Sequence, residues 1–227
     1  MGQRDQVARE AEDILAAFEA RIPSHWDGRR AILELKDADY QWRQMEWIGW
    51  FFEFRANEAL RARFGHHPGP SYGNTRFDFR LGNVWDFKAH PAGGSSWTIV
   101  NDQEAVDLCI SDHGGLGVAL AIGTAQYDDV RGTFKAWHDA LKGDTSDYER
   151  ERVRRGAPSR RRKTAFDLRR YLFLWFTRNL IEQGPRRGWI DEFQTGMRNA
   201  DGSPRRPKYQ IDLDAVPADA IVIDRSL

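Results

Sequence analysis

The sequence predicts a mixed α/β fold in which helices flank a central mixed sheet. Aromatic and β-branched residues alternate with polar residues over 77–88, as in a β-hairpin, and the apolar run at 117–127 is typical of a buried strand. A third strand is expected at 97–100, and segments with helical periodicity lie around these strands. Helices are expected at residues 1–22, 42–64, 103–111, 132–141 and 164–183.

The hairpin at residues 77–88 carries two carboxylates and a lysine beside one turn. A glycine-asparagine pair signals the turn, and side chains two residues apart on a strand share a face. A three-residue loop would make Asp78 oppose Asp86, with Lys88 on the same face. A two-residue turn would instead put Asp78 on the other face and break the cluster. We expect the three-residue loop or a bulge.

These three side chains suit the binding of a divalent metal ion. Two neighbouring carboxylates repel each other unless one is protonated or a cation lies between them, and oxygen ligands of this kind suit Mg²⁺. Lys88 could hold or deprotonate a water molecule, or neutralise a phosphate charge. The simpler alternative is a solvated hairpin on an unrelated α+β protein, with Asp78 and Asp86 exposed on different faces.

The spacing Asp-x7-Asp-x-Lys, formed by Asp78, Asp86 and Lys88, resembles the catalytic motif of the PD-(D/E)xK nuclease superfamily. That superfamily contains most type II restriction endonucleases. Phe77 stands where its pattern has proline. The order of the expected elements over residues 42–141, namely helix, hairpin, third strand, helix and buried strand, also resembles the restriction-endonuclease-like αβββαβ core.

The resemblance implies a Mg²⁺-dependent endonuclease that hydrolyses double-stranded DNA, most simply a sequence-specific type II restriction enzyme. Asp78 and Asp86 would bind one or two Mg²⁺ ions together with the backbone carbonyl of Phe87. Lys88 would position or activate the attacking water. Glu53, in the helix before the hairpin, would complete the site or bind a second ion; alternatively, it pairs with a basic side chain.

Partners and alternative functions follow from the same resemblance. A homodimer would cut both strands of a palindromic site, and a DNA methyltransferase would be the functional partner. The same core would equally serve a DNA-repair nuclease, a junction-resolving nuclease or an exonuclease. Outside enzymes, the alternative is a DNA-binding module without catalytic activity.

Basic residues gather in two segments that we expect to contact DNA. The first is an arginine-rich loop at 144–163, and the second is the tip of a C-terminal hairpin with strands at 193–198 and 208–213. Their side chains would contact phosphates or base edges, although either segment could equally be a solvated loop. The candidate DNA-binding residues are Arg154, Arg155, Arg160, Arg161, Arg162, Lys163, Asn199, Arg205, Arg206 and Lys208.

The 227 residues are expected to form one domain with a substantial core. The chain has 34 basic and 34 acidic residues, no apolar run of transmembrane length, and one cysteine, Cys109, which we interpret as a small buried residue. Its N-terminal helix is charged, unlike a signal peptide, so a cytoplasmic protein without a membrane partner is expected. The expected parts are an N-terminal helical segment (1–40), a catalytic core (41–143), the basic loop (144–163) and a helical and hairpin elaboration for DNA binding or dimerisation (164–227).

Overall fold

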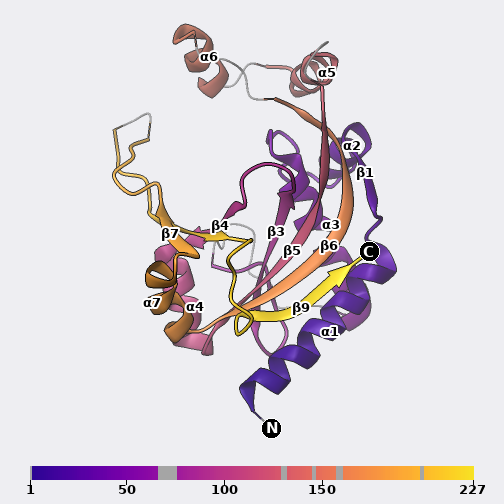
Figure 1. The fold of residues 1–227 in the computed structure, drawn as a ribbon. Helices are drawn as coiled ribbons and strands as arrows, with labels where there is room; N and C mark the ends of the chain where they lie inside the picture. The colour runs from indigo at the N-terminus through magenta and orange to yellow at the C-terminus, as the bar shows by residue number, and fades with distance from the viewer. Residues whose placement is uncertain (1, 66–75, 129–131, 145–146, 157–160, 200–201) are drawn as a thin grey trace.

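A curved six-stranded sheet forms the centre of the molecule (Figure 1). The structure, a computed structural model, describes residues 2–65, 76–128, 132–144, 147–156, 161–199 and 202–227. The strand order is β1-β6-β5-β3-β2, and β9 also pairs with β6. β3 and β5 are parallel, whereas the other neighbouring strands are antiparallel, so the sheet is mixed as predicted. The strands are β1 (His25–Asp27), β2 (Phe79–Arg80), β3 (Val84–Pro91), β5 (Leu116–Tyr127), β6 (Lys163–Phe176) and β9 (Ile221–Ser226).

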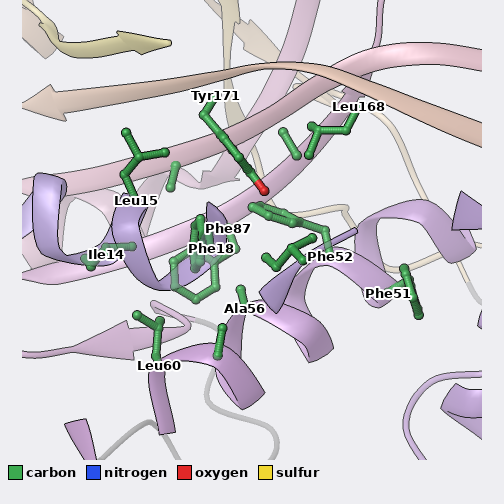
Figure 2. Packing of buried hydrophobic residues seen from close by; sticks show 14 of the residues in the cluster. Ile14, Leu15, Phe18, Phe51, Phe52, Ala56, Leu60, Phe87, Leu168 and Tyr171 are labelled. Atoms are coloured by element: carbon green, nitrogen blue, oxygen red, sulfur yellow. The ribbon is translucent and has the colours of Figure 1, made fainter. Parts of the chain in front are cut away.

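Three helices and one face of the sheet enclose an aromatic core (Figure 2). Phe18 and Phe52, from two of these helices, pack edge to face with ring centroids 5.5 Å apart, and both contact Phe87 of β3. Because the Phe87 side chain lies in this core, its neighbours Asp86 and Lys88 point to the other face of the strand. The helices are α1 (Gln3–Arg21), α2 (Gly28–Asp37) and α3 (Trp47–Phe64).

The opposite face of the sheet packs against a second core and a smaller antiparallel sheet with the strand order β4-β8-β7. Val118 and Leu120 of β5 and Leu172 of β6 are buried on this side. Cys109 is buried among them, as expected from the sequence. The elements on this side are β4 (Trp97–Asp102), α4 (Gln103–His113), α7 (Arg178–Arg187), β7 (Ile190–Phe193) and β8 (Lys208–Asp212).

Two further helices, α5 (Thr133–Lys142) and α6 (Asp147–Arg154), follow β5 and lie at one end of the molecule, at the top of Figure 1. Phe134 of α5 still reaches the aromatic core, and Arg29 of α2 lies over the ring of Trp137 on α5. Within the described ranges, no helix combines the length and the apolar character needed to cross a bilayer.

The hairpin that carries the acidic motif has the predicted three-residue loop. Phe79 pairs with Trp85, and Arg80 pairs with Val84. The amide of Asp78 also donates to the carbonyl of Trp85, at 2.8 Å, and so extends the contact beyond β2. The register is therefore the one that keeps the two motif carboxylates together.

Glu10 of α1 holds this loop from outside the hairpin. Its buried carboxylate accepts hydrogen bonds from the backbone amides of Gly82 (3.2 Å) and Asn83 (3.1 Å). The Asn83 side chain (2.8 Å) and the Trp85 indole (2.9 Å) also donate to it. One carboxylate thus satisfies four donors that would otherwise be buried without partners.

The helix predicted at 164–183 is wrong for most of its length, because residues Lys163–Phe176 form the long strand β6. Tyr171 and Phe173 belong to the aromatic core, whereas Leu172 and Leu174 belong to the core on the other face. A central strand that is buried on both faces is apolar at nearly every position, so its sequence also satisfies helical spacing. The helix α7 begins only at Arg178.

Three other expectations also need correction. Residues 144–163 are not one loop, because they contain α6, and Lys163 already belongs to β6. The third strand, β4, pairs with β8 in the smaller sheet instead of joining the motif hairpin. The strands β1 and β9 and the helix α2 were not expected from the sequence. A C-terminal hairpin is present, and β8 matches the expected strand at 208–213; its first strand is β7 (Ile190–Phe193), so the strand expected at 193–198 is wrong for all but Phe193.

Replacing Gly123 with alanine is expected to destabilise the sheet. A Cβ at this buried β5 position would lie 2.2 Å from the backbone oxygen of Asp167 on β6, where neither strand can move aside without disturbing the pairing. Overpacking of this kind costs about 1–3 kcal/mol. Gly49→Ala is the matched control, because a Cβ there meets nothing within 4 Å and α3 should gain about 0.5–1 kcal/mol. Urea unfolding measures both; equal stability of the two variants would contradict the close packing.

Candidate active site

Asp86 and Lys88 lie on the same face of β3, as the strand period predicts. The Asp86 side chain is only 2% exposed, and the Lys88 ammonium group contacts its Oδ2. Asp86 Oδ1 accepts a hydrogen bond from the Asn101 side chain on β4, at 3.2 Å. Asp86 is therefore a buried carboxylate held between a cation and an amide.

Asp78 lies at the edge of β3, just before β2. Its Oδ2 accepts a hydrogen bond of 2.6 Å from the backbone amide of Phe87. In a β-strand the amide and carbonyl of one residue point to the same side, so the Phe87 carbonyl faces this edge as well. The sequence-predicted ligands Asp78, Asp86 and Phe87 thus share one end of the hairpin.

Glu53 reaches the same edge from α3. The Tyr40 hydroxyl donates a hydrogen bond to Glu53 Oε1. The charges of Asp78, Lys88 and Asp86 all act on the Glu53 carboxyl group. The structure therefore brings together the four residues that were predicted from the sequence, although they come from α3, β3 and the segment before β2.

The pKa values of the acids in this cluster are raised. Burial, with the nearby charge of Asp78, raises the pKa of Glu53 to about 8, against the opposing effects of Tyr40 and Lys88. Burial raises the pKa of Asp86 to about 7, and that of Asp78 also lies above its usual range for the same reason. The pKa of Lys88 is raised by the charges of Asp86 and Asp78, which outweigh its burial.

The donor set fits a hard divalent cation. Three carboxylates face one lysine, so the ionised cluster has an excess of negative charge that a cation would neutralise. Among the residues that the structure describes, no three His, Cys, Asp or Glu side chains are arranged to hold a metal ion together. Mg²⁺ needs no such set, because it commonly binds through one or two carboxylates and keeps several water molecules.

The candidate DNA-binding residues near α6 and β6 have different environments. Arg154 and Arg155 pair with Glu151 on α6, Lys163 contacts Glu46, and Arg161 lies over the Tyr127 ring. Arg162 is buried, so the expectation that it is exposed in a loop is wrong. Arg160 lies outside the described residues.

The candidate residues of the C-terminal hairpin make contacts within the protein. The Asn199 side chain donates to the Ser203 hydroxyl at 3.0 Å. Arg206 and Lys208 pair with Asp102, which precedes α4 but does not cap it with its side chain. Both basic residues thus fasten the hairpin to the start of α4. Arg205 is exposed.

Sequence reasoning missed the residues that support the cluster from outside the motif. Tyr40 binds Glu53, Asn101 binds Asp86, and Glu10 holds the loop of the hairpin. Each lies on a different segment from its partner, and neither its spacing nor its residue type distinguishes it in the sequence. These contacts become visible only when the chain is folded.

Comparison of the chain with protein-family models, with curated proteins and with solved structures finds no match. The function is therefore inferred from the geometry of the acidic cluster alone.

The raised pKa of Glu53 gives an expected pH dependence of stability. Between its usual pKa of 4.5 and about 8, the folded metal-free protein holds a proton that the unfolded chain has released. The stabilising contribution is complete below this range and is lost as the pH rises through about 8. Thermal unfolding in EDTA should therefore show a smaller loss of stability with rising pH for Glu53→Gln than for the wild type. Parallel profiles would contradict the burial of this carboxyl group.

Proposed function

We propose that this protein is a Mg²⁺-dependent endonuclease that hydrolyses phosphodiester bonds of double-stranded DNA. The observation that carries the proposal is the convergence of Asp78, Asp86, Lys88 and Glu53 at one edge of β3. A solvated surface hairpin would leave these groups apart and exposed. Here Asp86 is buried, and the acids influence one another's pKa values.

Each residue of the cluster has a chemical role in the proposal. Asp78 and Asp86, with the Phe87 carbonyl, would hold Mg²⁺, and Glu53 would support this ion or a second one. When bound, the ion supplies Lewis-acid stabilisation of the charge that develops on the phosphate. Lys88 keeps its proton, since its pKa is raised, and therefore orients the attacking water and donates to a phosphate oxygen instead of acting as a base.

More specifically, we propose a type II restriction enzyme of the PD-(D/E)xK superfamily. It would act in the cytoplasm as a homodimer, with a DNA methyltransferase as its functional partner. The order α3-β2-β3-β4-α4-β5 supports it, because it follows the αβββαβ pattern along the chain. The position of β4 in the smaller sheet departs from a single shared sheet. Because the fold supports the restriction-enzyme proposal only in part, the proposal has to be tested by whether the protein cuts DNA at discrete sites.

Cleavage of unmodified plasmid and phage DNA tests the proposal. The wild-type protein is expected to give discrete bands in Mg²⁺ and intact DNA in EDTA. A smear in Mg²⁺ would replace the restriction assignment with a repair nuclease or exonuclease. Binding of DNA without cleavage of any duplex or junction would reject the enzyme in favour of a non-catalytic module.

A further inference from the structure

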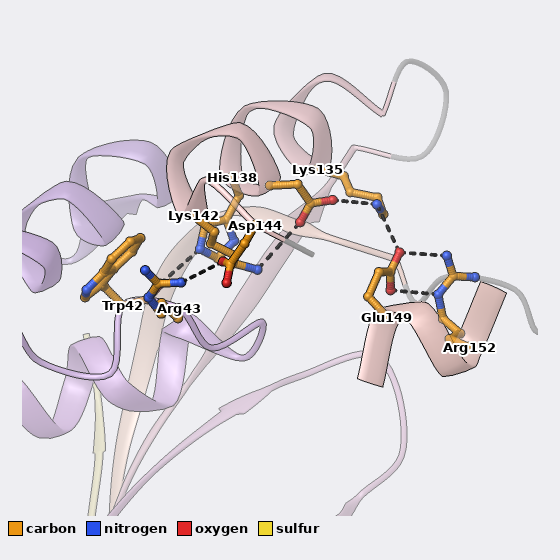
Figure 3. Close-up of polar contacts among 9 residues, drawn as sticks. Trp42, Arg43, Lys135, His138, Lys142, Asp144, Glu149 and Arg152 are labelled. Atoms are coloured by element: carbon orange, nitrogen blue, oxygen red, sulfur yellow. Dashed lines mark hydrogen bonds and ion pairs between the residues drawn. The ribbon is translucent and has the colours of Figure 1, made fainter. Parts of the chain in front are cut away.

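A second polar site lies away from the acidic cluster, in a groove between α5, α6 and the segment before α3 (Figure 3). The groove has a volume of about 1020 Å³. Six basic and four acidic side chains line it, so basic groups are in excess. The basic residues are Arg43, Lys135, Lys142, Arg152, Arg162 and Arg205.

The buried guanidinium group of Arg162 is the main evidence for a ligand in this groove. The residue is only 7% exposed, and its Nε and Nη1 atoms are buried without a hydrogen-bond partner among the described residues. A guanidinium group stays charged inside a protein, and a buried charge without a partner is costly. An anion entering the groove would supply the acceptor atoms that Arg162 lacks.

Each acid of the groove forms its ion pairs with another base, and the charge of Arg162 acts on Asp139 without an ion pair between them. Figure 3 shows the contacts of Asp144 with Arg43 and of Glu149 with both Lys135 and Arg152. The ion pairs are Arg43–Asp144, Lys135–Asp139, Lys142–Asp139, Lys135–Glu149, Arg152–Glu149 and Lys163–Glu46. Among the described residues, these pairs leave the Nε and Nη1 atoms of Arg162 without an acceptor at the wall of the groove.

The neighbouring groups respond to this positive charge. The pKa of His138 is lowered to about 4, first by burial and then by the charges of Lys142 and Arg162. His138 is therefore neutral at physiological pH, and its Nε2 is hydrogen-bonded with the Trp42 carbonyl at 2.9 Å. The pKa of Lys142 is also lowered, by burial and, in part, by Arg162. An anion is the ligand that such an environment favours.

The groove is linked to the strand that carries the candidate active site. Lys163, at the start of β6, contacts Glu46 in the groove wall. The charge of Lys163 also acts on His90, which lies two residues beyond Lys88 on β3. A strand of DNA bound at the acidic cluster would carry phosphate groups of the charge that the groove favours.

We propose that this groove binds a phosphate group of a nucleic acid, with Arg162 as the anchoring residue and Lys142 and Arg152 beside it. The identity of the ligand as DNA rests on the proposed nuclease function; the binding of phosphate does not. The phosphate is either a diester of the DNA backbone or a monoester at a 5′ end, and both offer at least two non-bridging oxygens that the planar guanidinium group can bind together.

Binding of labelled duplexes in EDTA tests this inference without any metal-dependent chemistry. Arg162→Met removes the charge and keeps most of the side-chain length; it is expected to weaken binding about tenfold or more. Arg186→Met, at an exposed position of α7, should bind as the wild type does. An equal loss for duplexes with and without a 5′-phosphate identifies a backbone diester, and a loss confined to the phosphorylated duplex identifies a terminal monoester.

If Arg162→Met does not fold, the test can be made with Lys142 and Arg152, which are partly exposed. Lys142→Met and Arg152→Met should each weaken duplex binding, and inorganic phosphate should raise the thermal stability of the wild type more than that of either variant. Wild-type affinity in all folded groove variants would overturn the inference, even if the protein cleaves DNA. Conversely, if the wild type cuts no DNA while these variants still lose duplex binding, the result would reject the nuclease function but support phosphate binding in the groove.

Discussion

Lys88→Ala is expected to lower the rate of Mg²⁺-dependent DNA cleavage by about 100- to 1000-fold, the usual cost of removing one donor from the developing charge of a transition state. Lys88 contacts Asp86 and its pKa is raised, so in the proposed mechanism its loss removes the group that would orient the water and neutralise the phosphate. Single-turnover cleavage of a labelled duplex measures the effect, because it separates the chemical step from product release.

The control for this variant is Lys36→Ala, which removes an exposed lysine from α2. It should cleave at the wild-type rate. Since Lys88→Ala leaves Asp86 without its counter-charge, thermal unfolding must be measured alongside the rate, and a folded Lys88→Ala protein with wild-type cleavage would exclude Lys88 from the reaction.

Glu10→Ala is expected to destabilise the protein by about 3–5 kcal/mol, since several buried donors lose their acceptor and each costs about 1–3 kcal/mol without full additivity. The affected donors are in the hairpin loop, at Gly82, Asn83 and Trp85. Loss of these bonds should also release the loop that sets the register of Asp78 and Asp86. Cleavage should therefore fall together with stability.

Urea unfolding of Glu10→Ala beside Glu12→Ala measures this contribution. Glu12 lies on the same helix but is exposed, so its replacement should change stability by no more than about 0.5 kcal/mol. If the two variants were equally stable, the loop would not depend on the buried carboxylate.

The motif hairpin could be predicted in detail because its signals are local. Alternating residues define the faces of the strands, and a turn signal restricts the loop to two lengths, of which only one unites Asp78 with Asp86. The three-residue loop is stabilised by Glu10, which is 72 residues away from Gly82 in the chain. No local pattern contains that information.

Segments buried on both sides were less predictable. Tyr171 and Leu172 are both apolar and adjacent, yet they belong to different cores on opposite faces of β6. Periodicity distinguishes helix from strand only when one face is polar. The same limitation explains why β6 was predicted as a helix.

Charged residues showed a further limit of sequence reasoning. Arg162 lies in an arginine-rich segment that suggested solvent exposure, but the structure buries it in a groove wall. Arg206 and Lys208 were expected to contact DNA; both pair with Asp102, although the Arg206 side chain stays 70% exposed. Composition indicates where basic residues gather, and the packing of the chain determines which of them remain available to a ligand.

Cleavage measured over a range of Mg²⁺ concentrations, for the wild type and Asp86→Asn, tests the proposed metal-dependent centre most directly. Asp86→Asn keeps the shape of the buried side chain but removes the charge that would hold the ion, and Asp37→Asn provides an exposed control. The wild type and the control should cut DNA only when Mg²⁺ is present, while Asp86→Asn stays folded and cuts at no concentration. Cleavage by folded Asp86→Asn with the wild-type dependence on Mg²⁺ would contradict the assignment of this cluster as the nuclease centre.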